Sequence, residues 1–352
     1  MRRVTHCNYV LIRFLTKNPI NVAVIGVGAF GRNHARVYHE LEQQGETMRL
    51  AAVVDTNPTL SSKVAEQFHV PAFTSIEQML AGGTEIHAAS VAVPTFAHLQ
   101  TAKSLMEAGI DVLVEKPIAS TVAEADELIR IAETNKRVAQ VGHVERFNPA
   151  VRATVPLITH PMFFEVHRLS VFTPRSLDVD VVLDLMIHDL DIVLSFVDSP
   201  VQEVRAVGLP ILSGKVDIAN VRIEFESGCI ANFTASRVST ERVRKLRFFQ
   251  PQQYISIDYG RQDVLIFSVG RDGGAPSPNP DIGITKPAVP SDEPLRAELK
   301  AFIEAVAARS RPVVSLNDGR HALALALDIT SAIHAHRTKL DLEGMTATRP
   351  SY

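Results

Sequence analysis

The chain has 352 residues, 46% hydrophobic and 21% charged, and its formal net charge is −3. This length suffices for two domains with separate cores, and the composition is that of an ordinary folded protein. The charge balance argues against the large basic surface that nucleic-acid binding needs, so we expect no nucleic-acid partner. No apolar stretch reaches the length of a transmembrane helix, so we also expect no membrane partner.

The amino terminus and the two cysteines bear on the expected compartment. Cys7 and Cys229 lack zinc-site spacing and cannot form a disulfide framework, so we expect reduced thiols, no metal and a cytoplasmic protein. Residues 1–17 superficially resemble a signal peptide, but Arg13 interrupts the apolar stretch and no small-residue cleavage site follows. We interpret residues 1–17 as a flexible extension or the product of an upstream start codon, in preference to an export signal.

The first predicted element is an apolar strand over Asn21–Ile25, which a glycine-rich turn and a helix from Arg32 to about Gln43 follow directly. In such a turn the first glycine permits a tight bend, the second admits a pyrophosphate, and the third lets the helix pack on the strand. The helix N-terminus offers free N–H groups and a partial positive charge to the phosphates. The expected dinucleotide contacts here are Gly26, Gly28, Ala29, Phe30 and Gly31.

A second predicted strand, Leu50–Asp55, ends in an acidic residue. A carboxylate at this position accepts hydrogen bonds from both ribose hydroxyls and repels a 2′-phosphate. Thr56 and Asn57 supply no cation to neutralise such a phosphate. We therefore expect NAD as the cofactor and regard NADP as the weaker candidate. The alternative is a structural aspartate at the turn before Asn57-Pro58.

The elements up to residue 142 alternate between helix and strand, which predicts a parallel, doubly wound sheet. Helices are expected over 59–68, 75–80, 96–108 and 121–134, and strands over 86–93, 112–116 and 137–141. The turn with Pro94, Thr95 and His98 leaves the end of a strand, and should lie beside the nicotinamide by topology. The alternative for His98 is that it only caps or packs the following helix.

Lys116 stands at the end of a buried strand, between Glu115 and Pro117. The sheet holds a lysine there and directs it outward at the carboxyl edge, where open α/β sheets bind ligands. Pro117 denies Lys116 a helical backbone and so sets its direction. Glu115 and Lys116 are therefore candidate cofactor contacts, and Lys116 is also a candidate catalytic residue. The alternative is a surface lysine after a strand.

A largely apolar helix is expected over about Asp180–Val197. Its polar residues Asp184, His188, Asp191 and Ser195 share one face, whereas Asp189 lies off this stripe. A polar stripe on a buried helix must face a partner, water or a cavity. A neighbouring aspartate raises the pKa of an imidazole and burial lowers it, so the sum can leave His188 near neutrality, as suits a general base. The alternative is a core histidine bonded to Asp184 without chemistry.

Together, the Gly26-x-Gly28-x-x-Gly31 turn, Glu115-Lys116-Pro117 and Asp184-x-x-x-His188 resemble the glucose–fructose oxidoreductase / inositol dehydrogenase (Gfo/Idh/MocA) family, over about residues 18–336. The resemblance implies an α/β N-terminal Rossmann domain that binds NAD or NADP and an α+β C-terminal domain with a large open antiparallel sheet. It also implies that Lys116 orients and polarises the reacting oxygen, that Asp184 hydrogen-bonds the substrate or the histidine, and that His188 is the general base.

Between the two domains the chain passes through Gly142–Pro149. The resemblance makes His143, Arg146 and Asn148 candidate substrate contacts there, although a structural junction with Arg146 in an ion pair is as probable for any one of them. Further on, Arg237 is the candidate for binding an anionic group of the substrate. It belongs to a basic cluster, with Arg242, Arg244, Lys245 and Arg247, that we expect to be mainly a solvated strand edge.

The second half alternates as successive strands do, and we expect them over 201–207, 216–225, 229–236, 243–249, 254–259 and 264–268. One face of such a sheet is free to bury against another subunit, which predicts a homodimer or homotetramer. Residues 271–294 are rich in Gly, Pro, Ser and Asp and are expected to form a long loop. Helices are expected over 295–308 and 318–336, and the resemblance implies that they return to the Rossmann domain.

The expected organisation is an extension (1–17), an NAD-binding domain (18–142), a substrate and oligomerisation domain (143–336) and a tail (337–352). A nicotinamide, a polarising lysine and a histidine base suit hydride removal from a secondary alcohol. Residues 141–149 and 185–191 look most like a branch that oxidises the 3-hydroxyl of UDP-N-acetylglucosamine for later transamination, as in lipid A biosynthesis. The alternatives are a dehydrogenase of a free sugar or cyclitol such as inositol, and a non-catalytic dinucleotide sensor.

Overall fold

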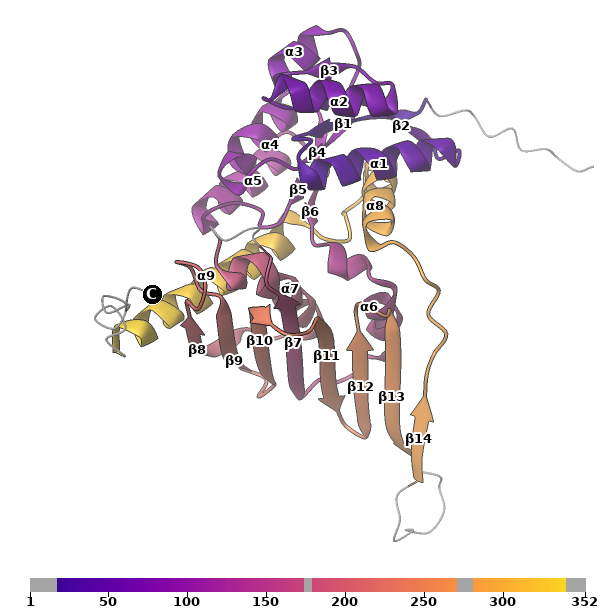
Figure 1. The fold of residues 1–352 in the computed structure, drawn as a ribbon. Helices are drawn as coiled ribbons and strands as arrows, with labels where there is room; N and C mark the ends of the chain where they lie inside the picture. Colours follow the sequence, from indigo (N-terminus) through magenta and orange to yellow (C-terminus); the bar gives the residue numbers. More distant parts are fainter. Residues whose placement is uncertain (1–17, 174–178, 271–280, 340–352) are drawn as a thin grey trace, which may run out of the picture.

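The computed structural model describes residues 18–173, 179–270 and 281–339, which form two sheets with their covering helices (Figure 1). The predicted extension, the first part of the predicted loop up to residue 280 and most of the predicted tail lie outside the described residues. No helix within the described ranges is both long enough and apolar enough to cross a membrane.

The first sheet is parallel throughout and has the strand order β3-β2-β1-β4-β5-β6. Its strands are β1 (Ile20–Ile25), β2 (Met48–Val54), β3 (Ala72–Phe73), β4 (Ala88–Val91), β5 (Asp111–Glu115) and β6 (Ala139–Gly142). Helices cover both faces, so β4, β5 and β6 are buried along their whole length. The strand order reverses between β1 and β4, and such a switch point is where doubly wound sheets bind ligands. The predicted Rossmann architecture is confirmed.

The helices of this domain are α1 (Ala29–Gln43), α2 (Pro58–Phe68), α3 (Ile76–Ala81), α4 (His98–Glu107) and α5 (Val122–Thr134), with a 3-10 turn at Thr95–Ala97. Local sequence explains where several of them begin. The Asn57 side chain caps α2, and Pro58 occupies the first turn, where its missing N–H is not needed. At the start of α5, Thr121 accepts the Glu124 N–H and Glu124 accepts the Ser120 N–H, an arrangement close to a capping box in which the glutamate reaches the residue before the cap.

The second sheet has the strand order β14-β13-β12-β11-β7-β10-β9-β8. Its strands are β7 (Phe163–Val171), β8 (Val201–Leu209), β9 (Ile218–Phe225), β10 (Ile230–Ser239), β11 (Val243–Gln250), β12 (Gln253–Asp258), β13 (Asp263–Gly270) and β14 (Asp281–Thr285). All neighbours pair antiparallel except β7 and β10, which run parallel. The prediction of a large antiparallel sheet is therefore confirmed apart from this one pair.

Helical segments cover the core face of the second sheet (Figure 1). They are α6 (Pro149–Thr154), a π-helical turn over Val182–Met186, α7 (Ile187–Phe196) and α9 (Leu316–Lys339); 3-10 turns at Val144–Phe147 and Val155–Leu157 flank α6. The sequence-based analysis did not predict β7 and α6. It also assigned β14 to a loop. In β7 the charged Arg168 takes a core-facing position, which hides the alternation of apolar residues.

The two carboxy-terminal helices connect the domains. The helix α8 (Pro294–Ala308) packs on the Rossmann sheet, where Leu299 and Phe302 join the core around β1. The helix α9 contributes Leu316 and Leu323 to the core of the first domain and Ile329 to that of the second. The helix α9 therefore belongs to both cores. It also packs against α7, and this packing holds the start of α7 beside the carboxyl end of β5, where Lys116 meets Asp184.

Candidate active site

A cavity of about 830 Å³ lies at the carboxyl edge of the Rossmann sheet, beside the glycine-rich turn. Residues that follow β1, β2 and β4 line it, as expected for a ligand site at a topological switch point. The predicted cofactor residues on its wall are Gly26, Gly28, Ala29, Phe30, Asp55 and Pro94. A volume of this size is within the usual range of small-molecule sites.

Each of the three glycines of the turn is needed for a different structural reason. Gly26 has a φ of +83°, and a Cβ there would lie 2.8 Å from the Ala92 carbonyl oxygen. A Cβ at Gly31 would lie 1.7 Å from the carbonyl oxygen of Gly26, so Gly31 is needed for the helix to pack on the turn. At Gly28 no atom lies within 4 Å of the Cβ position, and that open space belongs to the cavity. The residues therefore fit a dinucleotide whose phosphates approach Gly28.

Alanine substitutions should separate packing from phosphate binding in this turn. Gly28→Ala should leave the melting temperature nearly unchanged but weaken NAD binding about tenfold or more, because its methyl group occupies the phosphate approach. Gly31→Ala should destabilise the fold by several kcal/mol, because its Cβ overlaps backbone. Thermal unfolding and NAD titration of both variants test this. An equal loss of stability in the two variants would contradict it.

Asp55 lies on the cavity wall and is held by backbone donors. Its Oδ2 accepts the Val27 N–H at 2.9 Å, and its Oδ1 accepts the Asn57 N–H at 2.9 Å. Each carboxylate oxygen keeps a lone pair for a ribose hydroxyl. Among the described residues that line this cavity, none is a lysine or an arginine, and Glu77 adds a second acid. The wall thus offers acceptors for hydroxyls and no cation for a 2′-phosphate.

His98 packs between two turns, as in the alternative given for it, and its contact with the cofactor stays a prediction. Its ring is buried, with Nδ1 3.0 Å from the Pro117 carbonyl oxygen and Nε2 2.9 Å from that of Val93. Burial lowers its pKa, against the raising effect of these carbonyls. The imidazole connects the turns after β4 and β5, which supports the backbone next to Lys116. Thr95 lies in the 3-10 turn but does not line the cavity.

Lys116 follows the last residue of β5 and meets Asp184 from the second domain. Its Nζ donates a hydrogen bond to the Asp184 carbonyl oxygen at 2.7 Å and lies 3.7 Å from the carboxylate Oδ1. The side chain is only 16% exposed. Burial lowers the pKa of Lys116, and the charges of Asp184 and Glu115 oppose that shift. The Lys116–Pro117 peptide bond is cis.

The helix that carries Asp184 is not regular, contrary to the prediction of one α-helix over 180–197. It opens with the π-helical turn Val182–Met186 before α7. Such turns are rare and often mark functional sites. The wider turn leaves the Asp184 carbonyl accessible to the ammonium of Lys116. Ser195, predicted on the polar stripe, bonds instead to the Ile192 carbonyl of its own helix.

Glu115 lies behind Lys116 and does not line the cavity. Its Oε2 accepts the Lys116 N–H at 3.2 Å, and its Oε1 lies 3.0 Å from His34 Nε2. Gly142 provides the space for this carboxylate, since a Cβ there would lie 2.7 Å from Oε1. Glu115 therefore acts on the site through the position of Lys116.

His188 is half-buried at the start of α7, and its ring stands edge-on to that of His143, with 6.4 Å between centroids. Its pKa lies well below the usual value because of burial, and then because of the positive charges of Lys116 and Arg168. The expectation of a pKa near neutrality through Asp184 is wrong, since Asp184 faces Lys116 and cations dominate around the imidazole. The lowered pKa favours the neutral form of the His188 imidazole.

The predicted substrate contacts in the crossover after β6 interact with other residues of the chain. Arg146 binds Asp191 through Nε at 2.8 Å and Nη2 at 3.3 Å, so the alternative of an ion-paired arginine holds. His143 is buried 4.0 Å from the same carboxylate, and burial lowers its pKa. Asn148 caps α6 and donates to Glu145 and to the Tyr259 carbonyl. Asn148 thus has structural partners at the junction, and its contact with the substrate stays a prediction.

Sequence reasoning missed a buried charged network next to His188. Arg168 on β7 binds Asp189 through Nε at 2.6 Å and Nη2 at 2.9 Å, and Glu145 through Nη1 at 3.0 Å. Its guanidinium lies over the Tyr259 ring, 5.1 Å from the centroid. Asp189, which lies off the predicted stripe, therefore faces the sheet. The signal in the sequence that could have indicated this network is Arg168, a charged residue at a core-facing position of the alternating strand β7.

Arg237, the predicted contact for an anionic group, has a different position. It is 5% exposed, donates to the Val179 carbonyl and has its Nε 3.9 Å from Asp217. Asp217 also accepts three backbone N–H groups of residues 211–213. Arg237 thus stabilises the connection into the π-helical turn and does not face the cavity.

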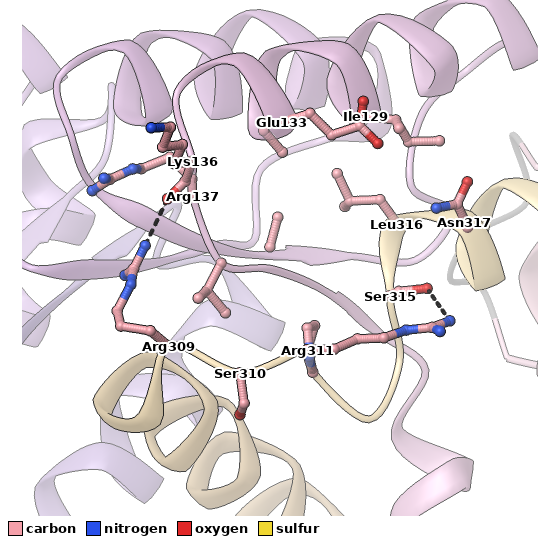
Figure 2. A pocket seen from close by; sticks show the side chains of 14 residues that line it. Ile129, Glu133, Lys136, Arg137, Arg309, Ser310, Arg311, Ser315, Leu316 and Asn317 are labelled. Atoms are coloured by element: carbon pink, nitrogen blue, oxygen red, sulfur yellow. Dashed lines mark hydrogen bonds between the residues drawn. The ribbon is translucent and has the colours of Figure 1, made fainter.

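A second cavity, of about 790 Å³, lies at the opposite, amino edge of the Rossmann sheet (Figure 2). Its three arginines, Arg137, Arg309 and Arg311, are engaged in structural contacts. Figure 2 shows Arg309 bonded to the Lys136 carbonyl and Arg311 to Ser315. Arg309 also pairs with Asp111, and Arg137 donates to the Gly109 carbonyl. Among the described residues no group of three or more His, Cys, Asp or Glu side chains is placed to hold a metal ion.

This fold and this site are those of a dinucleotide-dependent oxidoreductase. Residues 20–143 match the model of the oxidoreductase family with an NAD-binding Rossmann fold, and residues 159–254 match the GFO/IDH/MocA C-terminal domain. The chain belongs to the Gfo/Idh/MocA family and is an NAD(P)-dependent oxidoreductase acting on CH–OH donors.

Known proteins resemble the chain to different degrees. UDP-N-acetylglucosamine 3-dehydrogenase of Acidithiobacillus ferrooxidans is 36% identical over 90% of this chain and 98% of its own. A solved structure of that enzyme has a TM-score of 0.82 at 34% identity, over 90% of this chain and 98% of that one. Inositol 2-dehydrogenase of Acidothermus cellulolyticus is 29% identical over 54% of this chain and 58% of its own. Levoglucosan dehydrogenase in complex with NADH and levoglucosan shares the fold, with a TM-score of 0.77 at 18% identity over 90% and 98%.

Proposed function

We propose that the protein is an NAD-dependent dehydrogenase that oxidises the 3-hydroxyl of UDP-N-acetylglucosamine to the 3-keto sugar. The observation that carries this proposal is the contact of Lys116, which follows β5 of the Rossmann sheet, with Asp184 of the second domain, four residues before His188. The substrate is proposed from the relative of Acidithiobacillus ferrooxidans, which matches over 90% of the chain. The product suits transamination in amino-sugar or lipid A biosynthesis in the cytoplasm.

The proposed chemistry assigns one proton transfer to this chain. NAD, when bound, supplies the hydride acceptor. Lys116 donates a hydrogen bond to the reacting hydroxyl and stabilises the negative charge that develops on its oxygen. His188, neutral because its pKa is well below the usual value, takes the proton. Asp184 holds the ammonium of Lys116 in place through its carbonyl oxygen.

The preference for NAD over NADP is proposed from Asp55. In Asp55→Ser the ratio of kcat/KM with NAD to that with NADP should fall about tenfold or more, because a ribose ligand and a repelling charge are both lost. Glu77→Gln is the matched control, since it removes another acid from the same wall. Steady-state kinetics with both cofactors measure the ratio. An equal change in the two variants would assign the effect to general charge.

A substrate panel tests the proposed function. Reduction of NAD should be followed with UDP-N-acetylglucosamine, UDP-glucuronate, free N-acetylglucosamine, glucose and myo-inositol. We expect turnover with the first compound and a product lighter by two hydrogens, detected by mass spectrometry. Oxidation of a free polyol without any UDP-sugar would favour the cyclitol alternative. NAD binding without turnover of any candidate would favour the sensor.

A homo-oligomer through the second sheet is also proposed. An aromatic row crosses the solvent-side face of β7, β11, β12 and β13, with centroid separations of 5.6, 4.9 and 5.3 Å. The row consists of Phe163, Phe249, Tyr254 and Phe267. Exposed apolar surface of this kind is typical of a subunit interface. Light scattering of the purified protein should give the mass of a dimer or tetramer, and a monomer would contradict this proposal.

A further inference from the structure

Strand alternation divides the basic residues of β11 between the two faces of the sheet. Arg244 shares its face with Leu246 and Phe248, which are fully buried in the core. Lys245 and Arg247 point to the other face, where they lie 3.9 Å from Asp258 and 3.6 Å from Glu165. Arg244 therefore belongs to the side of the sheet that carries the active site, unlike its neighbours in sequence.

Arg244 lies close to the proposed catalytic histidine. It stands opposite Arg168 in the register of β11 and β7, and its charge lowers the pKa of His188. Figure 1 shows that β11 begins at the edge of the sheet that faces the Rossmann domain. The Arg244 side chain makes no ion pair or hydrogen bond with any part of the chain that the structure describes. An arginine so placed is available to an anionic ligand.

A cavity of about 400 Å³ opens beside Arg244 between the start of β11 and the end of β12. Four cations and two carboxylates line it, an excess of two positive charges. They are Arg242, Arg244, Lys245 and Arg261, with Glu241 and Asp258; because Lys245 and Asp258 belong to the outer face and Arg244 to the other, the cavity lies at the strand ends and reaches both faces. Asp258 lies 3.9 Å from both Lys245 and Arg261, which leaves Arg242 and Arg244 as the cations without a carboxylate within 4 Å among the described residues.

We propose that Arg242 and Arg244 bind the diphosphate of a nucleotide-sugar substrate in this cavity. The proposal rests on the proposed function and deepens it. In a sugar nucleotide the diphosphate is attached to C1, and a single ring carbon, C2, separates C1 from C3. A sugar whose C3 hydroxyl meets Lys116 and His188 therefore places its phosphates near the catalytic pair. Arg244 lies on that side because it stands opposite Arg168, which binds Asp189 next to His188. Guanidinium groups suit this role because they bind phosphate oxygens in a bidentate manner.

This subsite also separates substrate classes. A nucleotide sugar carries one negative charge on each phosphate, which matches the excess of two positive charges on the cavity wall. Free sugars and cyclitols have no group that uses these arginines. Binding energy from a part of the substrate that does not react can position the hydroxyl that does react. The arginines should therefore set the apparent affinity for the nucleotide sugar.

The test uses Arg244→Gln and Arg242→Gln, with Arg247→Gln on the outer face of the same strand as the matched control. Calorimetric titration with UDP should show Kd raised about tenfold or more in each test variant and unchanged in the control. KM for UDP-N-acetylglucosamine should rise in parallel and by a larger factor than kcat falls, while NAD affinity stays constant. Arg244→Lys should recover part of the UDP affinity, because it keeps the charge without the bidentate geometry. Melting temperatures verify that each variant is folded.

The outcomes separate this proposal from the proposed function. If the wild-type protein binds UDP but oxidises no N-acetylglucosamine nucleotide, and Arg244→Gln loses UDP binding, the subsite stands and the proposed substrate falls. If the wild-type protein oxidises UDP-N-acetylglucosamine and both arginine variants keep its KM and the UDP affinity within twofold, the subsite falls and the function stands. A wild-type protein that does not bind UDP overturns the subsite directly.

Discussion

Lys116→Ala should reduce kcat about 10³-fold while the dissociation constant of NAD changes less than about twofold. The reason is positional. Lys116 Nζ lies 2.7 Å from the Asp184 carbonyl at the meeting point of the domains, and Lys116 does not line the dinucleotide cavity. Its loss removes the donor to the reacting oxygen and leaves the glycine turn intact. Stopped-flow turnover and NAD fluorescence titration measure the two quantities.

Lys103→Ala is the control for this experiment, because Lys103 lies on α4 and its side chain is 38% exposed, with Glu107 as its partner. It should behave as the wild-type protein does. Retained turnover in Lys116→Ala would remove the proposed mechanism and favour the sensor. A parallel loss of NAD binding would instead place Lys116 in the cofactor site.

His188→Asn should lower kcat/KM by about 10² to 10⁴, the usual contribution of a positioned base. The wild-type pH profile provides a second readout. Only the neutral imidazole accepts a proton, so the rate falls as pH falls through the pKa of His188. Because burial, Lys116 and Arg168 hold that pKa well below 6.5, the acid limb should lie below the ordinary histidine range. The acid limb of the residual activity of Lys116→Ala should move to higher pH, because the loss of the Lys116 charge raises the pKa of His188.

The control for His188→Asn is His321→Asn. His321 is an exposed residue of α9 and lines none of the three cavities described above. It should keep the wild-type rate and profile. A His188→Asn variant with an unchanged acid limb would show that another group is the base. His143 would then be the first candidate, because its ring is the aromatic neighbour of His188.

The Rossmann half could be predicted almost element by element because each of its signals is local. The glycine spacing, the proline after Asn57 and the helix cap at Thr121 act within a few residues, and the structure has each of them in place. The position of Lys116 at the end of β5 followed from the same logic, since an apolar run in a parallel sheet ends at its carboxyl edge. Local chemistry was sufficient for that part of the site.

The second domain was harder because strand alternation gives the face of a residue but not the groups that pack against that face. Arg237 was assigned to the substrate, yet it has the same phase as the buried Ala231 and Phe233 and points into the core, where it donates to the Val179 carbonyl. That partner comes from another part of the chain, which the pattern of one strand does not show. Arg244, seven residues later, is the arginine that we propose for the anionic group of the substrate.

The pairing of Asp184 was a different kind of error. Helical spacing places Asp184 and His188 one turn apart, which suggested a hydrogen bond between them. Asp184 instead contacts Lys116, which lies 68 positions earlier in the chain, through both its carboxylate and its carbonyl oxygen. A contact across a domain boundary cannot be derived from the period of one helix.

The helix α9 has a consequence for how the molecule comes apart. Because α9 contributes side chains to both hydrophobic cores, with Leu323 in one and Ala322 and Ile329 in the other, neither half of the protein can lose its packing without exposing part of its neighbour. Calorimetry should record a single cooperative melting transition for the whole chain. For the same reason, a fragment cut before residue 316 should fail to yield a stable nucleotide-binding domain, even though every residue of the glycine turn would be present.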